Sequence, residues 1–116
     1  MDLRFAETMI DATPVVAVSG SVDLSTVPAL RSTLLRAVGR HPGAVVVVDL
    51  DGVDVLDDTG LGILLGAADH ARQRDGDVAI VCTDERLRQR LARSRLDRAV
   101  TVSSSITAAQ ERTATP

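Results

Sequence analysis

A nearly unbroken run of β-branched residues in the middle of the chain constrains the fold most strongly. Residues 44–50 read Ala-Val-Val-Val-Val-Asp-Leu. A strand with one face in water alternates apolar and polar side chains, whereas the valines of this run leave no polar face, which is typical of a strand buried on both faces. Such strands belong to parallel sheets that are covered by helices. The run therefore predicts an α/β fold.

Alternating strand and helix patterns on either side of this run predict the remaining elements. Strands are expected at residues 3–6, 15–18, 78–82 and 99–102, with a turn over 11–14 and a break in the second strand over 20–23. Helices are expected from a cap at Ser25 or Thr26 to Gly39, over 60–74, after a cap at Asp84 with Leu87 and Leu91 inward, and over 104–112. The elements predict one domain over residues 1–112, with a mixed, mostly parallel sheet of about four to five strands covered by about four helices. Residues 113–116 are expected to form a frayed tail.

Composition limits the possible classes of function. The chain has 116 residues, 45% of them hydrophobic, which suits one core and is too little for two. A formal charge of −3 and a single aromatic residue, Phe5, argue against nucleic acid and acidic membrane surfaces as partners. No apolar stretch approaches the roughly 18 residues of a membrane helix, and residues 1–10 lack the pattern of a signal peptide. We therefore expect a cytoplasmic protein.

The cysteine and the histidines do not indicate a metal or cofactor site. Cys82 is the only cysteine and lies in an apolar run, which predicts a buried, reduced thiol. His41 and His70 have no second ligand at metal spacing. We expect neither a metal nor a cofactor.

Two segments within residues 45–62 could accept phosphate, and the first is the Asp-Leu-Asp-Gly sequence after the valines. With the valines it resembles the first motif of the haloacid dehalogenase phosphatases, in which the first Asp, here Asp49, attacks phosphorus and the second, here Asp51, is the general acid. That chemistry also needs a cation, usually lysine, and further carboxylates for magnesium, and this chain has no lysine. The alternative is that both aspartates end a buried strand and open a polar loop.

The second candidate is the hydroxyl in Asp-Asp-Thr-Gly-Leu-Gly, residues 57–62. Gly60 and Gly62 at the start of a helix leave the backbone open to another molecule, and Thr59 is placed to cap the free amides. A phosphate on Thr59 would meet the positive end of the helix dipole and add about −2 charge to a loop that already carries three aspartates. A partner on this loop would sense that change. The alternative is a helix cap with no further role.

The segment "DDTGLGILLGA" resembles the D-[ST]-[ST]-G-L-G motif of anti-sigma factor antagonists, the single-domain STAS proteins. "VSGSVDLSTVPALRSTL" is similar to the family's second strand, following loop and first helix, and "AVVVVDLDGVDVLDDTGLG" to its next strand and phosphorylation loop. The resemblance covers nearly the whole chain and implies a STAS-type fold. It also implies no enzymatic activity and no catalytic residue of its own.

The resemblance further implies a mechanism. The unphosphorylated protein would bind a cognate anti-sigma factor with serine/threonine kinase activity and so release the sigma factor. Phosphorylation of Thr59 would switch it off, and a phosphatase would reset it. The implied partner-binding positions are Asp23, Asp57, Asp58, Gly60, Leu61 and Gly62.

Two positions depart from the family, and other functions stay open. Ser21 stands where the family commonly has Glu, and Asp58, where it commonly has Ser or Thr, places a negative charge beside Thr59. Relatives with the same fold serve as STAS subunits of signalling scaffolds or transporter complexes.

A set of six arginines around the third helix could form a basic partner-binding face or a solvated helix surface: Arg86, Arg88, Arg90, Arg93, Arg95 and Arg98.

Overall fold

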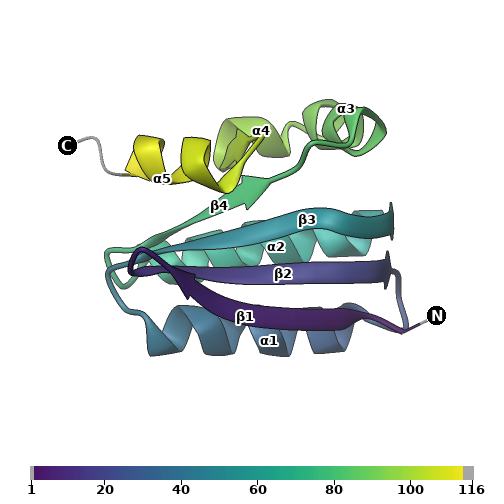
Figure 1. The fold of residues 1–116 in the computed structure, drawn as a ribbon. Helices are drawn as coiled ribbons and strands as arrows, with labels where there is room; N and C mark the ends of the chain where they lie inside the picture. Colours follow the sequence, from purple (N-terminus) through teal and green to yellow (C-terminus); the bar gives the residue numbers. More distant parts are fainter. Residues whose placement is uncertain (1, 114–116) are drawn as a thin grey trace.

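The computed structural model describes residues 2–113, with side chains described as far as residue 110, and contains one five-stranded sheet in the order β1-β2-β3-β4-β5 (Figure 1). The strands are β1 (Arg4–Ile10), β2 (Thr13–Val22), β3 (Val45–Leu56), β4 (Asp77–Val81) and β5 (Thr101–Ser103). β1 pairs antiparallel with β2, and every other pair is parallel. The predicted α/β class and the mixed, mostly parallel sheet are confirmed.

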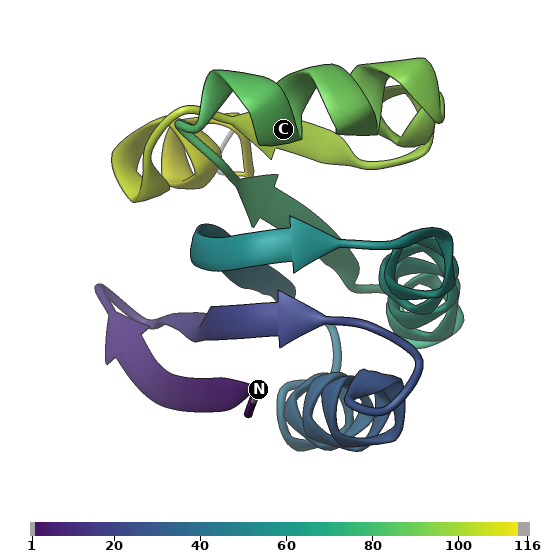
Figure 2. The ribbon, with the colours of Figure 1, turned by 90° about the vertical axis from the view of Figure 1, so that its right-hand side faces the viewer.

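Helices cover both faces of the sheet unequally. They are α1 (Val27–Arg40), α2 (Asp58–Arg72), α3 (Glu85–Arg93), α4 (Leu96–Ala99) and α5 (Ile106–Thr113). α1 and α2 lie side by side on one face, α5 lies on the other, and α3 and α4 lie beyond β4 (Figures 1 and 2). The short α4 is the helix that the sequence pattern did not predict. Within residues 2–113, no helix combines the length and the apolar character needed to cross a membrane.

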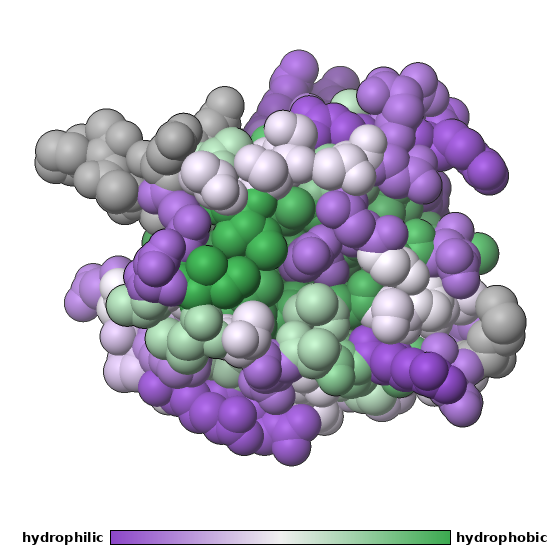
Figure 3. Space-filling view, viewed as in Figure 1, coloured by the Kyte–Doolittle hydropathy of each residue, from purple (hydrophilic) through white to green (hydrophobic). Residues whose placement is uncertain are grey.

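The valines of β3 explain why the sheet needs cover on both sides. Val46 and Val48 belong to the larger core cluster, together with Leu30 and Leu34 of α1 and with the inward residues of α2. Val47 points to the opposite face and packs in a smaller cluster that includes Ala109 of α5. Each of these three valines is at most 1% exposed, so the strand is buried on both faces as predicted. Apolar side chains also gather beside α5 on that second face, while polar ones surround α3 (Figure 3).

The first three strands are longer than the sequence pattern predicts, whereas β4 has the predicted length and β5 is one residue shorter. β2 passes through Gly20 to Val22 with an irregular register, so the predicted break over residues 20–23 is wrong. Gly20 makes this passage possible: its φ is +107°, and a Cβ there would lie 2.3 Å from the backbone oxygen of Asp2. β3 likewise continues to Leu56, so Asp49 and Asp51 lie within the strand and do not open a loop. The turn between β1 and β2 is shorter than the predicted residues 11–14 and consists of Asp11 and Ala12, both at positive φ.

The helix boundaries differ by a few residues from those that the sequence pattern predicts. α2 begins at Asp58, before the expected Gly60, and ends at Arg72. Residues 96–99 form α4, so β5 begins at Thr101. The last helix, α5, includes Thr113, and the remainder of the expected tail, 114–116, lies outside the described residues. Asp84 caps α3 with Leu87 and Leu91 buried, as predicted.

Cys82 is a buried free thiol, also as predicted, and burial raises its pKa.

Candidate functional site

The two segments that carry the candidate residues meet at one edge of the sheet. β2 and β3 run parallel, with Val22 opposite Leu56 in the register. Asp57, the residue after β3, donates its backbone N–H to the Val22 oxygen at 3.1 Å. The loop after β2, residues 23–26, therefore lies against the start of α2, residues 57–60. We call these two segments the carboxyl edge; Figure 2 looks onto it.

Asp57 organises the start of α2. It is the N-cap residue, in an extended conformation, and its Oδ1 accepts hydrogen bonds from the N–H groups of Thr59 (3.1 Å) and Gly60 (3.3 Å). A carboxylate satisfies free amides at a helix start and also suits the positive end of the helix dipole. The expectation that Thr59 caps the helix is therefore wrong, because Asp57 already holds those amides.

Thr59 is the second residue of α2 and is exposed. Its hydroxyl donates a hydrogen bond to Oδ1 of Asp57 at 2.5 Å. The hydroxyl oxygen predicted to accept a phosphoryl group thus stands at the surface, hydrogen-bonded to a carboxylate. A carboxylate in that position can orient the hydroxyl and accept its proton during phosphoryl transfer.

The glycines and the leucine after Thr59 play different parts. A Cβ on Gly60 would lie 2.5 Å from Val22 Cγ1 and 2.7 Å from Leu56 Cδ1, so this glycine allows α2 to pack closely on the strand ends. Leu61 is 8% exposed and belongs to the core. Gly62 is exposed, and a Cβ there would meet nothing within 4 Å. Of these residues, Gly62 is the one open to another molecule.

Asp23 holds the neighbouring loop in shape. Its Oδ1 accepts hydrogen bonds from the Ser25 hydroxyl (2.7 Å) and from the N–H groups of Ser25 (2.9 Å) and Thr26 (3.1 Å). The bond from the Ser25 hydroxyl, followed by the backbone donors, lowers the pKa of the Asp23 carboxyl. The loop presents Leu24, 75% exposed, beside this fixed carboxylate.

The Thr26 hydroxyl ties this loop to the end of β2. It donates to the backbone oxygen of Ser21 at 2.8 Å and accepts from the Asp23 N–H at 2.9 Å. Ser21, which stands where the family that the sequence resembles commonly has Glu, is only 6% exposed. The loop therefore offers Asp23 and Leu24 at its surface, and not Ser21.

A long-range ion pair at the carboxyl edge could not be seen in the sequence. Arg90 of α3 approaches Asp58, with 2.7 Å between Nη2 and Oδ1, and its Nε donates to the backbone oxygen of Leu56. The Asp58 side chain is 92% exposed and that of Arg90 is 38% exposed. The negative charge beside Thr59 is thus paired within the molecule.

The family model for the STAS domain matches residues 6–109, from β1 into α5. The chain belongs to the STAS domain family. Among curated relatives, an anti-sigma-B factor antagonist of Staphylococcus aureus (strain NCTC 8325 / PS 47) is 32% identical over 89 residues, which are 75% of this chain and 80% of that protein. An anti-sigma-B factor antagonist of Listeria monocytogenes is 32% identical over 72 residues and is matched over 62% of its length.

A solved structure supports the same assignment. The crystal structure of an anti-sigma factor antagonist from Mycobacterium paratuberculosis matches with a TM-score of 0.86 and 26% identity, over 96% of this chain and 93% of that one. This STAS domain therefore has the fold of an anti-sigma factor antagonist along almost its whole length.

The phosphatase candidates of this STAS domain have structural roles. Asp51 Oδ1 accepts hydrogen bonds from the Thr83 N–H (2.6 Å) and the Thr83 hydroxyl (3.0 Å), which joins β3 to the segment after β4. Asp49 Oδ1 accepts the Asp51 N–H at 2.9 Å. Across the part of the chain that the structure describes, no group of three or more His, Cys, Asp or Glu side chains is placed to hold a metal ion. The Asp51 carboxylate thus links β3 to the segment after β4, while the Asp49 carboxylate makes a local contact within β3.

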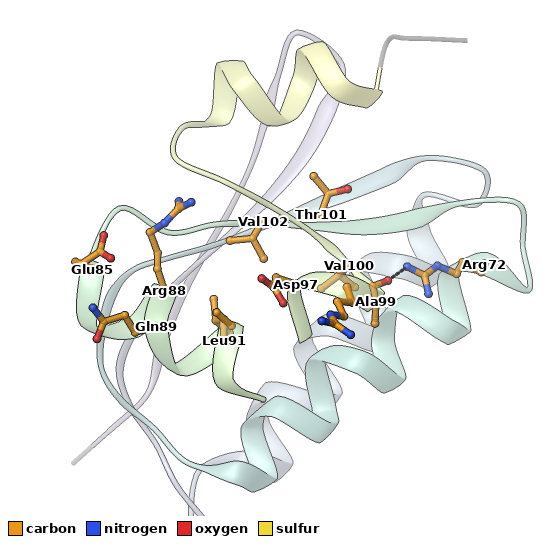
Figure 4. A pocket seen from close by; sticks show the side chains of 12 residues that line it. Arg72, Glu85, Arg88, Gln89, Leu91, Asp97, Ala99, Val100, Thr101 and Val102 are labelled. Carbon is orange, nitrogen blue, oxygen red and sulfur yellow. Dashed lines mark hydrogen bonds between the residues drawn. The ribbon is translucent and has the colours of Figure 1, made fainter. Parts of the chain in front are cut away.

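A pocket of this STAS domain that is lined partly by arginines lies away from the carboxyl edge. It has a volume of about 490 Å³ and lies between α3, α4 and β5 (Figure 4). Arg72 in its lining donates to the Ala99 oxygen and pairs with Asp77 at 3.0 Å, and Arg88 donates to the Cys82 oxygen at 2.9 Å. Glu85 and Asp97 also line it, so its charge is mixed. The lining includes none of the carboxyl-edge residues.

Proposed function

We propose that this STAS domain is an anti-sigma factor antagonist. Its unphosphorylated form binds a cognate anti-sigma factor with serine/threonine kinase activity and thereby releases the sigma factor. Phosphorylation of Thr59 by that kinase prevents binding, and a phosphatase restores it. The protein is a cytoplasmic regulator that works by binding, not as an enzyme. The names of the relatives support this proposal.

The observation that carries the proposal is the exposed Thr59 hydroxyl at the carboxyl edge. It stands on a fixed helix start, next to the loop that presents Asp23 and Leu24, so one partner surface can contact both segments. Phosphate adds about −2 charge at neutral pH. A surface that fits the neutral hydroxyl would then face a bulky anion, and like-charge or desolvation costs of several kcal/mol are typical of such mismatches.

The partner-binding residues divide into two groups in this proposal. Asp23, Asp58 and Gly62 contact the partner directly. Asp57, Gly60 and Leu61 act by holding the first turn of α2 in position, since Asp57 caps it and the other two are buried.

The test uses the kinase-type anti-sigma factor encoded nearest to this gene, purified and incubated with the protein and Mg-ATP. Mass spectrometry should find one phosphate, on Thr59. Thr59→Ala should take none, while Thr59→Ser, the matched control, should still be phosphorylated. Phosphate on Ser21, Ser25 or Thr26 would refute the assignment.

A second assay separates the switch from the phosphatase alternative. The protein with magnesium should not hydrolyse an aryl phosphate. Turnover that disappears in Asp49→Ala would instead show that the chain is an enzyme.

A further inference from the structure

We infer that a phosphate on Thr59 binds the guanidinium of Arg90 within the same molecule, and that Asp58 competes with this phosphate for the guanidinium. The inference rests on the proposed phosphorylation of Thr59 and adds how this chain accommodates it. It makes Arg90 a positioning residue for the phosphorylated state.

Arg90 is held beside the acceptor by contacts from a different element. It comes from α3, yet its Nε donates to the last carbonyl of β3, Leu56, and its Nη2 pairs with Asp58 at 2.7 Å. Asp58 and Thr59 are adjacent in the first turn of α2, so their Cα atoms are about 3.8 Å apart. The guanidinium has five donors, and these two contacts leave others for a phosphate oxygen.

Phosphorylation must break the present arrangement of Thr59. The hydroxyl now donates a hydrogen bond to Asp57 Oδ1. A phosphate ester has no such proton, and it would place about −2 charge against the Asp57 carboxylate. Asp57 is fixed by the two amides that it caps. The Thr59 side chain, which is exposed, is therefore the group that moves.

Electrostatics favours Arg90 as the new partner. Asp54 near the end of β3, the N-cap Asp57 and Asp58 of α2 all carry negative charge that repels a phosphate. Among the salt bridges of the described residues, the Asp58–Arg90 pair is the one that brings a cation to the start of α2. A dianion attracts a guanidinium more strongly than a monovalent carboxylate does, and the geometry of Arg suits phosphate. The exposed Asp58 side chain can be released to solvent at little cost.

The experiment uses full-length protein in which phosphothreonine is incorporated at position 59 during expression, so no kinase is needed. Phosphorus-31 NMR then follows the titration of the phosphate in the parent, in Arg90→Gln and in the control Arg98→Gln. Arg98 is an exposed arginine of α4 that lines the pocket away from the carboxyl edge. Arg90→Gln should raise the titration midpoint by about half a pH unit, because a nearby cation favours the dianion. Arg98→Gln should leave the midpoint unchanged.

Asp58→Asn provides a second variant at an exposed position. It should lower the midpoint, and by less when combined with Arg90→Gln, since part of the effect is the release of Arg90. An unchanged midpoint in Arg90→Gln, or an equal shift in Arg98→Gln, would overturn the inference. Equal effects of Asp58→Asn in both backgrounds would also overturn it. These readings do not depend on whether a cellular kinase modifies Thr59, so they are independent of the test of the proposed function.

Discussion

Thr59 is both exposed and fixed in place because Asp57 precedes it by two residues. The carboxylate of Asp57 accepts hydrogen bonds from the backbone amides of Thr59 and Gly60 and from the Thr59 hydroxyl. The helix start therefore does not depend on the hydroxyl that the proposed switch modifies. Stability and signalling are assigned to neighbouring residues of one turn.

This division of roles predicts different costs for two alanine substitutions. Asp57→Ala removes the cap and should lower the free energy of unfolding by about 1–2 kcal/mol. Thr59→Ala removes one exposed hydrogen bond and should cost less than about 1 kcal/mol. Urea unfolding followed by circular dichroism measures both. A larger loss in Thr59→Ala than in Asp57→Ala would show that the hydroxyl is the structural cap.

Asp23 predicts a pH dependence of stability. Its pKa in the folded protein lies below its ordinary value, chiefly because of the Ser25 hydroxyl. The unfolded chain therefore binds more protons in this range, so the contribution of Asp23 is present at neutral pH and is lost as the pH falls below about 4. Asp23→Asn should remove this part of the acid sensitivity. Urea midpoints across the acid range test it, and identical pH profiles for both proteins would contradict it.

At the scale of elements, α2 is placed by the fit of one glycine against two strand ends. Gly60 has room for a hydrogen but not for a Cβ between Val22 and Leu56, while Gly62 faces open space. The two glycines of one motif thus serve packing and surface access respectively.

These two glycines predict that substitution by alanine has opposite effects on the free energy of unfolding. Gly60→Ala should destabilise the protein by about 1–3 kcal/mol, because the added methyl forces side chains or backbone to shift. Gly62→Ala should stabilise it by about 0.5–1 kcal/mol, since alanine favours a helix interior over glycine. Thermal or urea unfolding of the two variants gives the comparison. Equal effects of both substitutions would contradict this packing.

The elements also show what sequence can and cannot predict here. The valines of β3 predicted a strand buried on both faces because their pattern leaves no polar side. The extension of β3 beyond Asp51 could not be predicted, because its polar residues and Gly52 resemble a loop until β2 pairs with them. Asp57 and Thr59 can both cap a helix, so the sequence alone does not decide between them. In the structure Asp57 is the cap, and its backbone N–H also donates to the Val22 oxygen. The Asp58–Arg90 pair joins residues 32 apart in sequence and leaves no local pattern.

At the scale of the whole molecule, the parallel order of β2 and β3 creates the proposed binding surface. It brings residues 23–26 and 57–60 to the same edge, although α1 and the whole of β3 separate them in sequence. α3 contributes Arg90, whose guanidinium pairs with Asp58 at this edge. Of the other arginines, Arg88 and Arg98 line the pocket of mixed charge, and Arg86 and Arg93 line a second pocket with Arg90 and Asp54. Arg90 is the arginine of this segment that forms an ion pair at the start of α2.

This arrangement predicts that Asp23→Ala weakens binding of the anti-sigma factor more than it weakens folding. The carboxylate is at the surface beside Leu24, and its loss should reduce the affinity by about tenfold. Calorimetric binding and thermal unfolding of the same variant separate the two effects. A large fall in melting temperature with an unchanged affinity would show that Asp23 has only a structural role.

The most direct test of the central claim is the affinity of the anti-sigma factor for two forms of the protein, measured by calorimetry. One form is unmodified, and the other carries phosphothreonine at position 59. We expect the unmodified form to bind and the phosphorylated form to bind at least about tenfold more weakly, because the phosphate adds about −2 charge at the carboxyl edge. Equal affinities of the two forms would contradict the account.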